Sequence, residues 1–302
     1  MEDKKLLLFG AGRSCINFIE QNPALRVVAI ADNDPAKWGT QLRGISIVSP
    51  AQLHGLAFDA IVVTTVWSDS VLVQLAELGY GDRETLIPGK REMKGMRDSQ
   101  PFAHAPTREL ASHLIDWLYQ MAEEQGVTLY LDFGTLLGAL REGDFIAWDD
   151  DIDFSVNADE FATLLTALQH RMHLLPDCQS GRWKVESFTL DDQPFAIRIT
   201  CEGDGAGLLS FETDIARRVR RDGQAVVIGS MPEFFCPECH FDGHDLVPFL
   251  GQVRKAPQAA EAYLDFVYGD WRTPRRDMTF ADYSHATQVD FDRFVPQRSR
   301  LD

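Results

Sequence analysis

The first part of the chain alternates short aliphatic runs with longer amphipathic stretches. The aliphatic runs lie at residues 6–9, 27–30, 45–48, 60–63 and 85–87. Because these runs are continuously apolar, they predict strands buried on both faces, and the stretches between them predict helices that connect parallel strands. The pattern therefore predicts an α/β fold whose first domain, residues 1–90, is a small Rossmann-like parallel sheet.

The pattern changes after residue 90. Residues 91–106 carry charges and chain breakers without a sustained apolar period, which predicts a linker. Apolar residues then recur at helical spacing over residues 107–125. Further on, strands are expected at 128–131, 152–156, 195–200 and 225–228, and helices at 158–169 and 256–268. This order predicts that residues 107–302 form a second domain of the α+β class.

Composition adds three constraints. Hydrophobic residues make up 45% of the 302 residues, which is enough for two cores. The formal net charge of −17 argues against non-specific binding to nucleic acid or anionic lipid, so an anionic substrate would need a cation or a basic pocket. The apolar run that ends at Gly10 is too short for a signal peptide or a transmembrane segment, and the five cysteines are scattered. These features predict a cytoplasmic protein with reduced thiols.

A glycine-rich turn follows the first predicted strand. Gly10 and Gly12 precede a predicted helix, and Asp32 ends the second strand, where a carboxylate that binds a ribose would lie. These three residues are candidates for cofactor binding. However, Cys15 replaces the third glycine of the dinucleotide fingerprint. The alternative is that the glycines only permit a tight turn. The stretch resembles the N-terminal domains of bacterial sugar acetyltransferases, and this resemblance implies a sugar nucleotide rather than a redox cofactor.

The second domain contains an acidic cluster at residues 149–153. Asp151 and Asp153 are two residues apart on a predicted strand, so their side chains point to the same face. Such a pair can bind Mg²⁺ or Mn²⁺ together with substrate phosphates. The alternatives are a solvated turn or a calcium loop. Phe154 lies where an EF-hand-type calcium loop needs glycine, which disfavours that alternative.

Residues upstream of the cluster suit the binding of phosphate. Gly134 and Thr135 are expected in a flexible turn with backbone donors and a hydroxyl group, and Arg141 is a candidate phosphate clamp. A glycine loop followed by two aspartates is typical of nucleotidyltransferase sites, in which a later strand supplies a third carboxylate. Asp214 and Glu212 are the candidates for that carboxylate, and exposed surface acids are the alternative.

Two further groups of residues have competing interpretations. Cys236 and Cys239, with His240 or His244, could hold a structural Zn²⁺, but only half of a zinc motif is present, and buried cysteines are the alternative. Tyr268 and Trp271 could stack on a base or a sugar, although aromatic residues at helix ends more often belong to a core.

Two blocks of sequence resemble the LicD family, which includes the fukutin-type transferases. The first block joins residues 134–141 (GTLLGALR) to residues 145–153 (FIAWDDDID), and the second contains residues 263–264 and 268–271 (YGDW). The first block departs from the family at Ala147, where a proline is usual. The resemblance implies a nucleotidyltransferase-like fold and transfer of a phospho-alcohol, commonly phosphocholine from CDP-choline, to a saccharide or glycolipid acceptor of a surface glycan such as lipopolysaccharide, capsule or teichoic acid.

Roles within the acidic cluster are divided on chemical grounds. Asp151 and Asp153 are assigned to the metal, whereas Asp149 and Asp150 are each either a third ligand or the base that accepts the proton of the acceptor hydroxyl group. Two alternative functions stay open. The protein could be a nucleotidyltransferase that makes a CDP-activated donor, or a non-catalytic protein that binds a sugar nucleotide.

Overall fold

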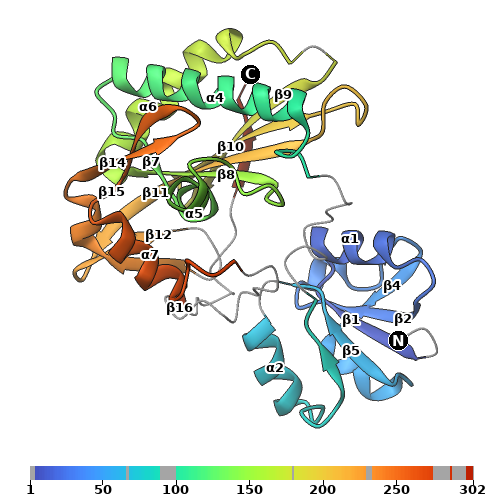
Figure 1. Cartoon of the computed structure of the whole chain (residues 1–302). Coiled ribbons are helices and arrows are strands. Elements are labelled where there is room, and N and C mark those ends of the chain that lie inside the picture. Colours follow the sequence, from blue (N-terminus) through green and yellow to red (C-terminus); the bar gives the residue numbers. More distant parts are fainter. Residues whose placement is uncertain are drawn as a thin grey trace. The chain divides into compact units, whose positions relative to one another are not determined.

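The computed structural model describes residues 4–65, 68–88, 100–178, 180–228, 233–274, 286–287 and 297–301. The chain divides into two compact units. We call them unit 1, described within residues 4–88, and unit 2, described within residues 100–301. Most of the predicted linker, residues 91–106, lies outside the described residues, and helix α4 begins at Ala105, before the predicted end of that linker. Figure 1 labels most of the elements of both units.

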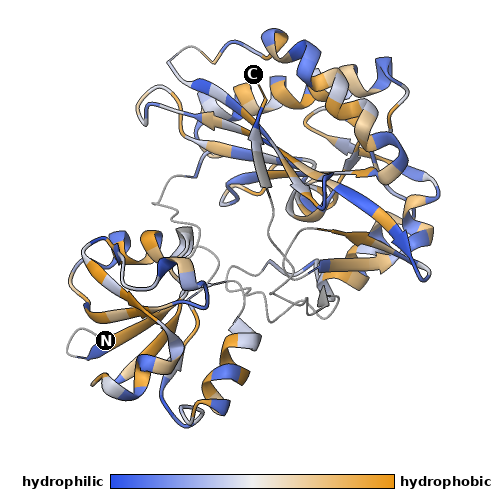
Figure 2. Cartoon of the chain, turned by 180° about the vertical axis from the view of Figure 1, so that it is seen from behind, coloured by the Kyte–Doolittle hydropathy of each residue, from blue (hydrophilic) through white to orange (hydrophobic). Residues whose placement is uncertain are grey.

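Unit 1 is built on a parallel sheet. Its strands are β1 (Lys5–Phe9), β2 (Arg26–Ala31), β3 (Gln41–Leu42), β4 (Ile45–Val48), β5 (Ala60–Val63) and β6 (Thr85–Leu86). They are arranged in the order β3-β4-β2-β1-β5-β6, and all neighbours are parallel except the β3–β4 pair. The predicted strands of this region are therefore confirmed, and the strands are mostly hydrophobic (Figure 2).

Two helices within the described residues of unit 1 explain why its strands are apolar throughout. Side chains of a strand alternate between the two faces of the sheet. One core contains Leu6 and Leu8 of β1 with residues of α1 (Arg13–Gln21), and the other contains Leu7 and Phe9 with residues of α2 (Ser68–Glu77). The helices therefore cover opposite faces, and both faces of the sheet are buried. Short 3₁₀ helices cover Pro35–Lys37 and Pro50–Gly55.

Unit 2 contains a larger mixed sheet. Its strands are β7 (Tyr130–Leu131), β8 (Asp151–Asn157), β9 (Arg182–Leu190), β10 (Gln193–Glu202), β11 (Phe211–Arg221), β12 (Gln224–Val227), β13 (Glu233–Pro237), β16 (Ala286–Thr287) and β17 (Gln297–Arg300). The main path runs β16-β13-β12-β11-β10-β9-β17. Strand β8 pairs with β11 in parallel and with β7 in antiparallel orientation.

One face of this sheet is covered by helices, and the other is exposed only in part. Ile152 and Phe154 of β8 and Ile197 of β10 are buried in a core that also contains residues of α4 (Ala105–Glu124) and α6 (Ala158–Arg171). Figure 1 shows α4 lying across the strands. The residues between them on β8 and β10, such as Asp153 and Arg198, keep part of their surface exposed. We call this second side the open face.

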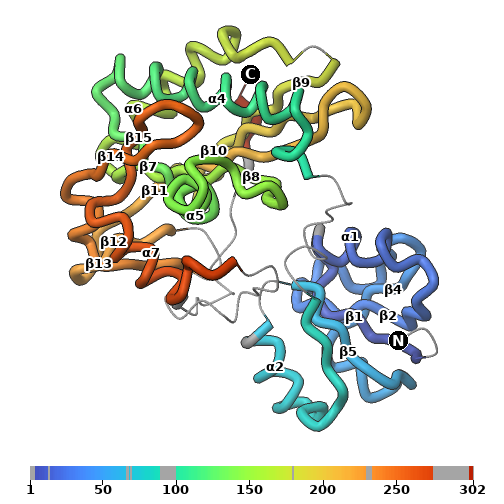
Figure 3. Tube along the Cα trace, in the orientation of Figure 1, coloured from blue at the N-terminus to red at the C-terminus, as the bar shows by residue number. Residues whose placement is uncertain are grey.

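The remaining elements pack around the sheet. They are α5 (Phe133–Glu142), the hairpin of β14 (His244–Phe249) and β15 (Gln252–Pro257), α7 (Ala260–Tyr268), and 3₁₀ helices at Met172–Leu174 and Glu238–Phe241. The hairpin lies beside β7 (Figure 3). The helix predicted at residues 256–268 was placed too early, because residues up to Pro257 pair with β14. Among the described residues, no helix combines the length and the apolarity that crossing a membrane requires.

Candidate metal and phosphate site

Four carboxylate side chains are directed to the open face where β8 runs beside β11. Parallel pairing sets Glu212 opposite Asp151 and Asp214 opposite Asp153. Partners in a sheet point to the same side, so all four side chains share one face. The two acids proposed as the third carboxylate are therefore neighbours of the predicted metal pair. The chain brings these residues together although about sixty positions separate β8 from β11.

Arg198 of strand β10 offsets part of this negative charge. Its Nε and Nη2 atoms each donate to one oxygen of Asp214 at 2.7 Å, and its Nη1 atom lies 3.1 Å from Oε2 of Glu212. Burial alone would lower the pKa of Arg198, but the carboxylates of Asp214, Glu212 and Asp151 raise it above its ordinary value. Arg198 is therefore a fixed cation within the carboxylate group.

The segment before β8 adds two more carboxylates. Oxygen atoms of Asp149, Asp150 and Asp151 all lie within 4.8 Å of one another, and each of these residues is half-buried. The Asp149 amide donates to the carbonyl of Ile146, and the Asp150 amide donates to Oδ1 of Asp149. Clustered oxygen donors of this kind suit Mg²⁺ or Mn²⁺. Within the described part of the chain, no other group of three metal-ligating side chains lies so close together.

Gly134 and Thr135 lie in the first turn of helix α5, so the prediction of a flexible loop was wrong. Glycine favours a turn, but Asp132 caps a helix here by accepting from the Phe133 amide. The Gly134 amide donates to Oδ2 of Asp153 at 3.3 Å, and the Asp153 amide donates to Oγ1 of Thr135 at 2.8 Å. The positive end of the helix is thus directed at the carboxylates.

A side chain at position 134 would meet the carboxylates that lie beside it. A Cβ atom added there would lie 2.6 Å from Oδ2 of Asp149 and 3.6 Å from Oδ2 of Asp153. These two carboxylates therefore border the same point of the helix. The close approach of α5 to the acidic segment depends on the missing side chain.

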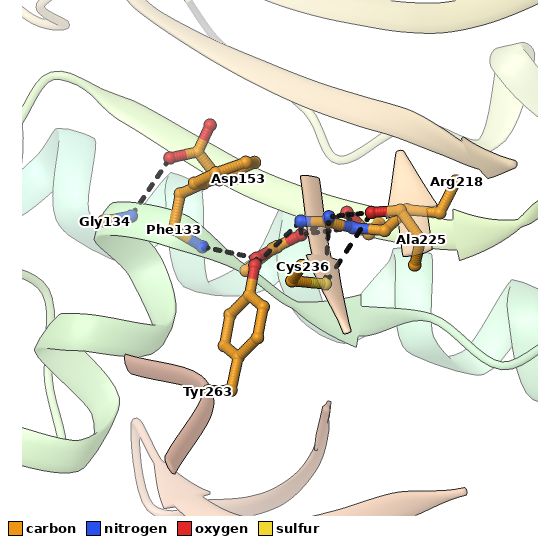
Figure 4. Close-up of polar contacts among 9 residues, drawn as sticks. Phe133, Gly134, Asp153, Arg218, Ala225, Cys236 and Tyr263 are labelled. Atoms are coloured by element: carbon orange, nitrogen blue, oxygen red, sulfur yellow. Dashed lines mark hydrogen bonds and ion pairs between the residues drawn. The ribbon is translucent and has the colours of Figure 1, made fainter. Parts of the chain in front are cut away.

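A buried polar network holds the start of α5 in place. Asp132 is fully buried and accepts from Nη2 of Arg218 at 2.5 Å and from the hydroxyl groups of Ser155 and Tyr263. Figure 4 shows Arg218 and Tyr263 converging close to Phe133, with Asp153 beside Gly134. Burial alone would lower the pKa of Arg218, but Asp132 raises it above its ordinary value, so Arg218 is a buried cation.

Arg141 lies in the last turn of α5, about 10 Å along the helix axis from Gly134 at the usual rise per residue. Its side chain is 8% exposed, and its Nη2 atom is 3.9 Å from Oε1 of Glu142. This buried Nη2 atom has no hydrogen-bond partner among the described residues. A buried donor without a partner fits an anion ligand, as the prediction of a phosphate clamp requires.

The residues suggested for zinc do not form a close group of three ligands among the described residues. Cys236 is buried and lies 3.7 Å from the carbonyl of Ala225, whereas Cys239 is exposed. His240 is hydrogen-bonded through Nδ1 to the carbonyl of Gln258, and His244 is on the exposed start of β14. Burial raises the pKa of the Cys236 thiol to about 11, as expected for an unreactive core cysteine.

The aromatic candidates near the C-terminal block differ in exposure. Trp271 is buried, and its Nε1 atom donates to Asp265 at 2.8 Å, which agrees with the core alternative. Tyr268 packs partly buried against the same core.

The glycine turn of unit 1 is tied to Asp32. The carboxylate of Asp32 accepts from the amides of Ala11 and Asp34 and from Nζ of Lys37. Gly10 has a φ of +105°, and an added Cβ atom would lie 2.8 Å from Cβ of Thr65. These contacts explain Gly10 and Asp32 as parts of a tight turn, which was the alternative to cofactor binding. Gly12 precedes α1, and nothing lies within 4 Å of an added Cβ atom there.

Sequence analysis did not identify three residues that shape the site. Arg198 and Arg218 lie on strands β10 and β11, and no local pattern in the sequence distinguishes them from arginines at the surface. Asp132 could have been predicted as a helix N-cap from the sequence, because aspartate is preferred directly before an apolar helical segment. That signal was missed when the following glycine was interpreted as a loop.

Two stretches of the chain match models of known protein families. Residues 126–259 match a family described as LicD/FKTN/FKRP, nucleotidyltransferase domain, and residues 2–86 match one described as C2185-like, N-terminal. The resemblance to the LicD family is therefore confirmed. The second description names neither a Rossmann domain nor a sugar acetyltransferase, so those likenesses of residues 1–90 stay predictions.

Individual relatives match over shorter stretches. Lipopolysaccharide cholinephosphotransferase LicD of Haemophilus influenzae is 39% identical over 49 residues, which cover 16% of this chain and 18% of that protein. Ribitol 5-phosphate transferase FKRP of Homo sapiens is 25% identical over 170 residues, 54% of this chain and 31% of that protein. The matched segments thus span less than a third of either relative.

A solved structure of ANT(2″)-Ia in complex with adenylyl-2″-tobramycin is 15% identical over 58% of this chain and 83% of that chain. Its TM-score of 0.33 is too low to establish a common fold.

Proposed function

We propose that this protein transfers a phospho-alcohol group to a glycan. The premise is that residues 126–259, which match the LicD family model, form a nucleotidyltransferase domain. The donor is a CDP-linked alcohol such as CDP-choline, and the acceptor is a saccharide or glycolipid hydroxyl group of a surface glycan. The reaction depends on Mg²⁺ or Mn²⁺. Two relatives support the general class, because their names describe a cholinephosphotransferase and a ribitol 5-phosphate transferase.

One observation carries the proposal. The register of β8 and β11 places Asp151 and Asp153 beside Glu212 and Asp214, next to the amide end of α5. In phosphoryl transfer the protein mainly positions groups and neutralises charge. Carboxylates that gather cations, set beside backbone donors and the capped helix end, supply both functions.

The donor set fits a hard divalent cation. All the clustered ligands are carboxylate oxygens, and those of Asp149, Asp150 and Asp151 lie within 4.8 Å of one another. Asp151 and Asp153 would hold the cation, and Asp149 borders the same helix end as Asp153. When bound, such a cation neutralises the negative charge of the donor pyrophosphate and of the departing CMP.

Side chains and backbone amides of the chain orient the donor phosphates and accept the proton of the acceptor. The buried guanidinium of Arg141 is available to orient the donor phosphates, because its Nη2 atom lacks a partner among the described residues. The Gly134 amide, which donates to Asp153, places the positive end of α5 beside the same phosphates. Thr135 contributes indirectly, since its hydroxyl group accepts from the Asp153 amide and so holds β8 against α5. Asp149 or Asp150 accepts the proton of the acceptor hydroxyl group.

The test is a screen of CDP-alcohols with Mg²⁺ or Mn²⁺, in which CMP release is measured with and without glycan acceptors. Asp151→Asn and Asp153→Asn should each reduce turnover at least about a hundredfold, because each substitution removes one charge that the cation requires. Asp192→Asn, in the exposed β9–β10 turn, is the matched control and should retain full activity.

Two results would contradict the proposal. The first is normal CMP release by Asp151→Asn or Asp153→Asn. The second is consumption of CTP with release of pyrophosphate in place of CDP-alcohol cleavage, which would identify a nucleotidyltransferase that makes the activated donor. Circular dichroism of each variant shows whether a lost activity reflects a lost fold.

A further inference from the structure

Strand β11 offers two carboxylates to the open face, and the structure distinguishes them. Asp214 lies opposite Asp153, and Glu212 lies opposite Asp151. The Glu212 amide also donates to the carbonyl of Asp150 at 3.4 Å. Glu212 is therefore the residue of β11 that adjoins the group of Asp149, Asp150 and Asp151.

Arg198 contacts Asp214 and Glu212 with different geometry. It binds both oxygens of Asp214 through two nitrogen atoms at 2.7 Å, the paired geometry in which guanidinium and carboxylate interact most strongly. Its contact with Glu212 is a single one, at 3.1 Å. A cation at Asp214 would have to compete with a bidentate pair to Arg198, whereas Arg198 approaches Glu212 with its remaining nitrogen atom, at the longer distance.

We propose that Arg198 is a positioning residue that selects Glu212 as the third carboxylate of the metal site by holding Asp214 in a bidentate pair. Asp214 then acts only through Arg198, and the guanidinium fixes the direction in which the Glu212 side chain leaves β11. Groups that orient metal ligands in this way affect metal affinity strongly although they do not touch the ion. This inference rests on the proposed metal-dependent function and names a ligand within it.

The direction in which cation affinity changes when Arg198 is replaced distinguishes a positioning role from a purely electrostatic one. Arg198→Met removes a positive charge beside a cation site, so a bystander arginine would make cation binding tighter when it is lost. If Arg198 positions Glu212, the same substitution should instead weaken binding about tenfold. Arg198→Lys keeps the charge but not the planar fork, so it should also weaken binding.

The experiment titrates the full-length protein with Mn²⁺ alone and measures the free ion by electron paramagnetic resonance. Glu212→Gln should weaken Mn²⁺ binding at least about tenfold, as expected for loss of a ligand. Asp214→Asn should weaken binding too, and the double variant with Arg198→Met should bind no more weakly than Arg198→Met alone. Arg182→Met is the matched control, because Arg182 is on β9, 78% exposed and paired with Glu202. It should bind Mn²⁺ like the unmodified protein.

The outcomes are distinct. Equal or tighter Mn²⁺ binding by Arg198→Met, or unchanged binding by Glu212→Gln, would overturn the inference while leaving the proposed function intact. Additive losses for Asp214→Asn and Arg198→Met would also overturn it, because they would identify Asp214 as a ligand in its own right. If the unmodified protein bound no Mn²⁺, the metal-dependent function and this inference would both fail.

Discussion

Gly134 illustrates how a single missing side chain shapes the site. We predict that Gly134→Ala reduces turnover at least about tenfold, because the added Cβ atom would displace the Asp149 carboxylate, which lies 2.6 Å from its position. The fold should tolerate the change, since the displaced atom ends a short side chain. Alanine is also about 0.5–1 kcal/mol more favourable than glycine within a helix. Activity should therefore fall without a decrease in the free energy of unfolding.

Activity assays and urea unfolding of the same Gly134→Ala preparation test whether turnover falls while the free energy of unfolding does not. Gly55→Ala is a suitable control, because nothing lies within 4 Å of a Cβ atom added there. Gly138→Ala is a useful contrast, since its Cβ atom would lie 2.6 Å from the backbone carbonyl oxygen of Asp144 and should cost stability as well. Normal turnover of Gly134→Ala would contradict the prediction, because it would show that displacing the Asp149 carboxylate does not affect catalysis.

At the scale of elements, helix α5 is held by the buried pair of Asp132 and Arg218. We predict that Asp132→Asn lowers the free energy of unfolding by about 3–5 kcal/mol, because it leaves a buried guanidinium without its counter-charge. The side chains of Arg218 and Asp132 are 1% and 0% exposed, so water cannot compensate. Urea unfolding measures the effect.

A double-mutant cycle with Arg218→Met provides the control for this prediction. The double variant should be more stable than the sum of the two single losses implies, since removing both charges leaves no unpaired ion. Glu261→Gln, which breaks the exposed pair with Arg272, should change stability by about 1 kcal/mol or less. A loss of that small size for Asp132→Asn would mean that the network does not hold α5.

The same elements show what the sequence could and could not predict. Asp151 and Asp153 could be placed on one face because side-chain alternation along a strand is a local property. Glu212 and Asp214 could only be named as candidates, since their position beside β8 depends on the register of two strands that are distant in the chain. Arg198 could not be identified for the same reason. The helix predicted from residue 256 was wrong at its start because pairing with β14 outweighed the local preference.

The whole molecule consists of two units with separate cores. The buried clusters of residues 6–75 share no member with the buried cluster of residues 102–301. The carboxylates, Arg198 and the capped helix α5 all belong to unit 2. A domain with its own core can in principle fold by itself, so the chemistry of the site and the stability of unit 1 should be separable.

We therefore predict that core substitutions act on one unit at a time. Leu8→Ala in β1 and Leu164→Ala in α6 each remove a side chain that is 0% exposed, and each should destabilise its own unit by about 2–5 kcal/mol. Hydrogen exchange followed by mass spectrometry should show faster exchange in peptides of the substituted unit only. In addition, Leu8→Ala should leave Mn²⁺ affinity unchanged. Faster exchange in both units after either substitution would instead mean that the two cores unfold as one cooperative structure.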